Sequence, residues 1–63
     1  MSTEINNGAR FKVGEVWMTP RGYLYLVKEI VGSQATLRMG IDGTGRKVRR
    51  NIDATNGWLI YRF

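Results

Sequence analysis

Turn signals divide this chain into short segments, and their spacing restricts the fold more than any other feature of the sequence. The turns recur at intervals of roughly 8 to 12 residues, a pattern typical of sheets built from short strands. We expect them at residues 19–22, 32–34, 40–45 and 53–57. The segments between them are rich in β-branched and aromatic residues and show no helical periodicity, which predicts an all-β fold.

Five strands are expected, at residues 11–18, 23–31, 35–39, 46–52 and 58–63. A change of phase in the first of them predicts a bulge or bend at Gly14. The second carries apolar residues on both faces, as a strongly bent barrel strand does. In the third, alternation directs Ala35, Leu37 and Met39 to the core. One helical turn is expected at residues 53–56, with Asp53 as its N-cap and a left-handed glycine after it.

With 63 residues and no cysteine, the chain can form one small domain without disulfides. A domain of this size buries only about 60% of its unfolded surface, so large apolar rings must supply much of the core. Trp17 and Trp58 are therefore expected in the core; the alternative is that one of them stands with Tyr23, Tyr25 or Tyr61 on the barrel face. Residues 1–10 are polar and have no apolar period, so we expect a flexible N-terminal lead-in there and a small β-barrel domain over residues 11–63.

This layout resembles the SH3-like small barrels. The shared features are the opening segment 13–17, the long second strand, the hairpins through 32–34 and 40–45, and the short turn before a last strand. The resemblance implies a five-stranded SH3-like barrel with one short helical turn before the last strand. Barrels of this type that bind proline-rich peptides use an acidic loop, whereas the equivalent turn here carries Arg21, so such ligands are not expected. In length and in its bracketing tryptophans, the chain also resembles small uncharacterised proteins of phages and prophages.

Positive charge is concentrated toward the C-terminus. Ten Lys and Arg residues against five Asp and Glu give a net charge of +5, and residues 44–63 carry five cations against one acid, Asp53. Four of those cations fall within residues 46–50. They could protect a strand edge from pairing, or they could bind a phosphate-rich partner. Arg50 has the inner parity of its strand, so either the strand is bulged there or Arg50 lies at a rim with its head in water.

The candidate nucleic-acid-binding residues are Arg38, Arg46, Lys47, Arg49 and Arg50, with Tyr23 and Tyr25 as rings for base stacking. Residues 40–45, rich in glycine, are expected to form a mobile hairpin tip beside them. Residues 40–47 resemble a phosphate-binding glycine loop, but they end in Gly45-Arg46-Lys47 where such a loop needs Gly-Lys-Ser/Thr, and no helix is expected after them. We therefore do not expect a nucleotide site there.

Catalysis is not expected from this composition. Without histidine or cysteine the chain lacks the common general base, the thiol nucleophile and the usual transition-metal ligands. Its carboxylates form no close pair in the sequence, and neither serine has an activating partner. We predict no enzyme activity, no metal and no cofactor. The absence of cysteine, of a signal peptide and of a long apolar run predicts a cytoplasmic protein.

These patterns favour a non-enzymatic module that binds the phosphate backbone of nucleic acid with little sequence specificity. DNA and RNA, single or double stranded, remain open, as does the oligomeric state. The alternative is a protein–protein interaction module, such as a phage-encoded modulator of a host or partner protein, that uses the same cations or a free strand edge against an acidic surface. A third interpretation is a structural subunit of an assembly.

Overall fold

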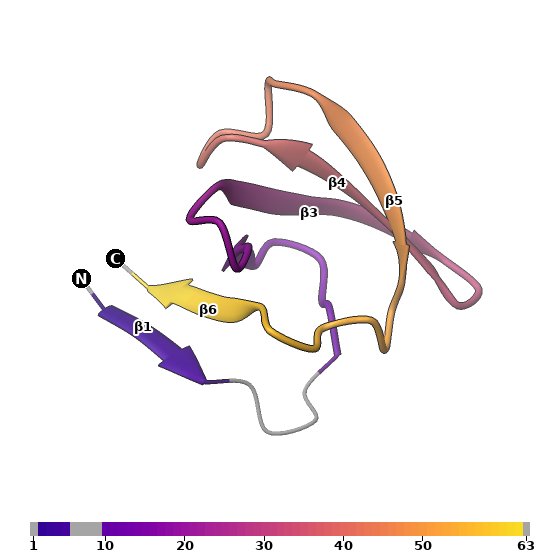
Figure 1. The fold of residues 1–63 in the computed structure, drawn as a ribbon. Helices are drawn as coiled ribbons and strands as arrows, with labels where there is room; N and C mark the ends of the chain where they lie inside the picture. Colours follow the sequence, from indigo (N-terminus) through magenta and orange to yellow (C-terminus); the bar gives the residue numbers. More distant parts are fainter. Residues whose placement is uncertain (1, 6–9, 63) are drawn as a thin grey trace.

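The computed structural model describes residues 2–5 and 10–62, whose six strands form one antiparallel sheet (Figure 1). The strands are β1 (Ser2–Ile5), β2 (Val16–Met18), β3 (Leu24–Val31), β4 (Gln34–Met39), β5 (Lys47–Asn51) and β6 (Leu59–Arg62). Their order is β1-β6-β2-β3-β4-β5, so β1 and β5 are the two edges of the sheet. The all-β prediction is confirmed. Across these described ranges no helix is long and apolar enough to cross a bilayer.

The sheet has one strand more than the five that were expected. Ser2–Ile5 forms β1 and pairs with Leu59–Arg62 of β6, although the sequence analysis predicted no element in residues 1–10. Four residues with no apolar alternation carry little strand signal of their own, and pairing with a neighbouring strand supplies the hydrogen bonds. Residues 6–9 of the expected lead-in lie outside the described residues, and its flexibility stays a prediction.

Short turns connect the strands close to the predicted positions. The 19–22 turn is confirmed: the Gly22 N–H donates to the Thr19 carbonyl at 2.9 Å, and the Thr19 hydroxyl accepts from the Arg21 and Tyr23 N–H groups. β3 and β4 are joined by only two residues, Gly32 and Ser33. Gly32 has φ +60°, and in the part of the chain that the structure describes only glycines have a positive φ, which matches a two-residue hairpin with glycine first.

The strand expected at residues 11–18 is shorter in the structure: residues 12–15 form a bend, and the strand β2 begins only at Val16. The Glu15 N–H donates to the Lys12 carbonyl, and Gly14, at φ +90°, donates its N–H to the Val27 carbonyl. The bend predicted at Gly14 is confirmed. It lets Glu15 accept the indole N–H of the fully buried Trp17 at 3.2 Å, which satisfies the one polar atom of that ring.

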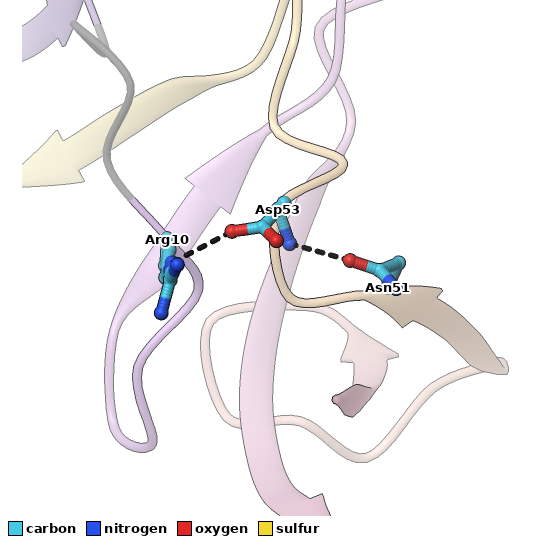
Figure 2. A network of polar contacts seen from close by, with 3 residues as sticks. All are labelled: Arg10, Asn51 and Asp53. Atoms are coloured by element: carbon cyan, nitrogen blue, oxygen red, sulfur yellow. Dashed lines mark hydrogen bonds and ion pairs between the residues drawn. The ribbon is translucent and has the colours of Figure 1, made fainter. Parts of the chain in front are cut away.

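The helical turn expected at residues 53–56 is not found. Two successive tight turns replace it: the Ala54 N–H donates to the Asn51 carbonyl and the Trp58 N–H donates to the Thr55 carbonyl. Asp53 therefore caps no helix. Its N–H donates to Asn51 Oδ1 at 2.9 Å, and its carboxylate pairs with the Arg10 guanidinium at 2.7 Å (Figure 2).

The core lies on one face of the curved sheet and is built around aromatic rings. Trp17 is fully buried and Trp58 is 8% exposed, so the core positions predicted for both are confirmed. Phe11 packs edge-on against each of them, with ring centroids 5.0 Å from Trp17 and 5.2 Å from Trp58. The other buried members are Tyr25, Val27, Ala35 and Leu37, and Met39, Val48 and Ile52 pack against them. The inward positions predicted for Ala35, Leu37 and Met39 on the third strand are thus confirmed.

A β-bulge explains why β3 has apolar residues at both parities. Its register with β4 shifts between Val27 and Glu29. Tyr25 and Val27 are buried before the shift, and Ile30 packs on the core after it. One extra residue in a strand reverses the alternation from that point. The bulge therefore places Glu29 on the outer face, opposite the core.

Candidate nucleic-acid interface

The basic residues of β5 lie on an edge strand with β4 on one side. Lys47 is opposite Arg38 and Arg49 is opposite Thr36, whereas Val48 is opposite the buried Leu37. Residues that face one another across antiparallel strands project to the same side of the sheet. Arg38, Lys47 and Arg49 therefore share the outer face, away from the core.

Arg50 projects to the other side of β5. It is paired with the buried Ala35, yet its side chain is exposed and its Nη1 donates to the Arg49 carbonyl at 3.3 Å. The register from Lys47 to Asn51 has no shift, so β5 is not bulged at this residue. Of the two interpretations of Arg50, the bulge is thus wrong, and the rim position with a packed stem stays a prediction.

Arg46 lies just before β5, and its carbonyl accepts the Met39 N–H at 2.8 Å. The side chains of Arg46, Lys47, Arg49 and Arg50 are all exposed. None of the four forms an ion pair with a carboxylate in the described part of the chain. Asp53, the nearest acid in the sequence, pairs with Arg10 instead (Figure 2). Like charges placed this close raise the local positive potential, which a polyanion lowers.

Arg38 has a different role from the β5 cations. It is half-buried, and its Nε donates to the Gly45 carbonyl at 3.0 Å. This bond ties β4 to the β4–β5 loop, residues 40–45. Arg38 thus adds charge to the outer face while holding that loop in place.

The β4–β5 loop folds back onto β3 instead of projecting as the mobile tip that its composition suggests. The Gly40 N–H donates to the Leu24 carbonyl at 2.8 Å. Gly43 is buried at φ +67°, and a Cβ there would lie 2.9 Å from side-chain atoms of Leu26 and Lys28. Glycine is required at this position by both the backbone conformation and the close approach.

Asp42 organises the tip of the same loop. It accepts the Thr44 hydroxyl at 2.9 Å and the Thr44 N–H at 3.2 Å. These donors, the hydroxyl first, hold the pKa of the Asp42 carboxyl below its ordinary value, and the charge of Lys28 acts in the same direction. The loop therefore carries its own negative charge at neutral pH.

The two tyrosines predicted to stack on bases lie in different environments. Tyr25 is 8% exposed and packs against Trp58 at a centroid distance of 5.8 Å, so its ring has no free face for a base. The stacking role predicted for Tyr25 is therefore wrong, because its side chain lies on the face of β3 that packs into the core. Tyr23 is 54% exposed and lies beside the Gly40–Leu24 hydrogen bond, as does the exposed Ile41. Tyr23 thus lies at the end of the sheet where β5 begins.

A shallow pocket of about 260 Å³ opens on the outer face of β3, β4 and β5. It is lined by Glu29, Val31, Gln34, Thr36 and Arg49. The sequence analysis missed it, because simple alternation without a bulge does not align Glu29 with Thr36 and Arg49. Arg49 belongs both to this pocket and to the basic edge.

No cluster of three or more metal-ligating side chains occurs in the ranges that the structure describes. No family model matches this chain, and no curated protein or solved structure is significantly similar to it.

Proposed function

We propose that this chain is a non-enzymatic module that binds the phosphate backbone of nucleic acid through the exposed cations of β5. The observation that carries the proposal is that Arg46, Lys47, Arg49 and Arg50 are exposed along one strand edge without a carboxylate partner in the described residues. Arginine suits phosphate because its planar guanidinium can donate two parallel hydrogen bonds. Phosphate is common to DNA and RNA, so the basic edge itself need not distinguish them.

The strand geometry supports contact with successive charges. Lys47 and Arg49 are two residues apart on the same face, a separation of about 6.8 Å in an extended strand. An edge strand also leaves room for a long polymer to lie beside it. Arg50, on the other side of β5, extends the positive charge around the edge.

We further propose that β2 to β6 form an SH3-like small barrel. In the order β6-β2-β3-β4-β5, the last strand of the chain lies beside β2, and the basic strand β5 lies at the other end. The central strand β3 is bulged and pairs with both β2 and β4. The Phe11 N–H donates to the Ile52 carbonyl at 3.1 Å, which joins the segment before β2 to the end of β5. This contact links the edge strand β5 to the segment that precedes β2, a strand inside the sheet, and such a link would help the curved sheet in Figure 1 to close into a barrel.

The test is binding of fluorescently labelled single- and double-stranded oligonucleotides at several salt concentrations. If about four phosphates are neutralised, log affinity should fall with log salt with a slope of about 3 to 4. The double variant Lys47→Ala/Arg49→Ala should bind all sequences more weakly and lower that slope by about 1.5 to 2.

The matched control is Lys12→Ala/Arg21→Ala, which removes two exposed cations outside β5 and the same total charge. It should keep most of the affinity and the slope. Equal losses for the two double variants would show attraction to overall charge, not to β5, and unchanged affinity on removing Lys47 and Arg49 would contradict the proposal.

The second candidate function is a protein-interaction module, and the position of β5 at the sheet edge favours it. The Arg46 carbonyl points toward β4, so the alternate backbone groups of Lys47 and Arg49 point away from the sheet. An acidic extended peptide could add there as a further strand. Retention of one protein partner from nuclease-treated lysate, with loss of that partner when Lys47 is replaced by proline, would favour this function over the first.

A further inference from the structure

The outer-face pocket has an arrangement that phosphate binding alone does not explain. Glu29 is opposite Thr36 on β4, and Thr36 is opposite Arg49 on β5, so the three residues form one row across the sheet. Val31 and Gln34 form the next row. A carboxylate thus faces a guanidinium across a threonine hydroxyl, with the pocket between them.

The polar side chains of this pocket have no partner within the described residues. No hydrogen bond or ion pair engages the Glu29 carboxylate, the Gln34 amide, the Thr36 hydroxyl or the Arg49 guanidinium. Other polar side chains on the same surface are engaged locally, such as Asp42 with Thr44. Four unengaged polar groups therefore surround one pocket.

Glu29 indicates the kind of ligand that would fit. An ionised carboxylate accepts hydrogen bonds only and repels phosphate, so a ligand beside it must offer donors. Arg49 offers only donors, so the opposite side of the ligand must offer acceptors. The Cα atoms of Glu29 and Arg49 are separated by two strand spacings, roughly 9.5 Å, which leaves room for a flat ring between their side chains.

We propose that this pocket binds one base of single-stranded nucleic acid, with guanine preferred. Guanine has two adjacent donors, N1–H and the 2-amino group, and two adjacent acceptors, O6 and N7. Glu29 accepts from the donors, and Arg49 donates to O6 and N7, the commonest arginine contact to guanine. Val31, which is 65% exposed, provides an apolar surface for the ring.

The inference rests on the proposed function, because Arg46, Lys47 and Arg50 hold the backbone that delivers the base while Arg49 contacts the base itself. It adds a preference at one nucleotide to otherwise sequence-independent binding. It also selects single strands, since the N1–H and 2-amino groups of guanine are occupied in a duplex.

The experiment measures the affinity of the chain for uridine pentamers that carry one central guanine, adenine or inosine, compared with the all-uridine pentamer. Guanine should bind about five- to tenfold more tightly than adenine, at the lower end of the discrimination that a bidentate contact supplies. Inosine lacks the 2-amino group and should fall between them.

Two variants separate the base contact from the backbone contact. Glu29→Gln should reduce the guanine preference, because the amide offers one acceptor in place of two and adds a donor, while affinity for the all-uridine pentamer stays equal or rises. Arg49→Lys keeps the charge but not the bidentate geometry, so it should reduce the preference with little effect on the all-uridine pentamer. Asp42→Asn is the matched control, because it removes one exposed carboxylate outside the pocket and should keep the preference.

The outcomes also separate this inference from the proposed function. Salt-dependent binding of every pentamer without a guanine preference would overturn the base pocket and leave phosphate binding intact. A preference that Glu29→Gln leaves undiminished would overturn the pocket as well. If no pentamer binds, both proposals fall.

Discussion

The inner and outer faces of β4 are built from alternate residues of the same six-residue strand, yet they use their side chains differently. On the inner face Ala35 and Leu37 are fully buried, and both belong to the hydrophobic core. On the outer face Gln34 and Thr36 line a pocket without engaging a neighbour among the described residues. The comparison teaches that stability depends mainly on one face and that the capacity to bind is left on the other.

The largest expected effect comes from a substitution on the inner face. Leu37→Ala should destabilise the domain by about 2 to 5 kcal/mol, because it removes buried methyl groups and leaves a cavity. Thr36→Val, one residue away on the outer face, should change stability by no more than about 0.5 kcal/mol. Urea unfolding followed by tryptophan fluorescence measures both, and similar losses for the two variants would contradict the division between the faces.

A smaller effect is expected where the β4–β5 loop covers part of the outer face. In Gly45→Ala the new Cβ would lie 2.7 Å from the Met39 carbonyl oxygen, which is backbone and cannot simply rotate away. We expect a loss of about 1 to 3 kcal/mol, as for other overpacked sites. Ser33→Ala, in the exposed β3–β4 turn, is the control and should be close to neutral. Wild-type stability in Gly45→Ala would show that the loop does not pack as described.

The smallest effect is a pH dependence from Asp42. Its folded-state pKa is lowered by the donors of Thr44, so its contribution to stability is complete above the unfolded pKa of about 3.9 and is lost as the pH falls through the folded value. The free energy of unfolding should therefore decline more steeply below about pH 4 in the wild type than in Asp42→Asn. Parallel pH profiles for the two proteins would argue against the Asp42–Thr44 bonds.

Much of the fold could be predicted from local patterns. The turns at Thr19–Gly22 and Gly32–Ser33, the bend at Gly14 and the core roles of Trp17 and Trp58 follow from residue types and short spacings. The helical turn at residues 53–56 could not be predicted reliably, because a cap residue followed by a glycine is compatible with either a helix or two tight turns. In the two tight turns that the structure has, Asp53 pairs with Arg10, a residue distant in the sequence.

The candidate site was only partly predictable for a related reason. The basic residues of β5 are adjacent in the chain, so their clustering was visible, and alternation correctly separated Lys47 and Arg49 from Arg50. Tyr25 was predicted to stack on a base only because tyrosine is a type of residue that often does so. The burial of Tyr25 against Trp58 depends on which strands the fold brings together, and the composition of the chain does not predict that.

The sequence by itself determined an all-β chain, an aromatic core and a cationic strand, because each depends on residue type and on the two-residue period of a strand. Only the tertiary structure decided that β1 joins the sheet, that β5 is an edge, and that Glu29 and Arg49 face each other across Thr36. The physical reason is that pairing and register join residues far apart in the chain, and one extra residue at the β3 bulge reverses which side chains lie on the outer face.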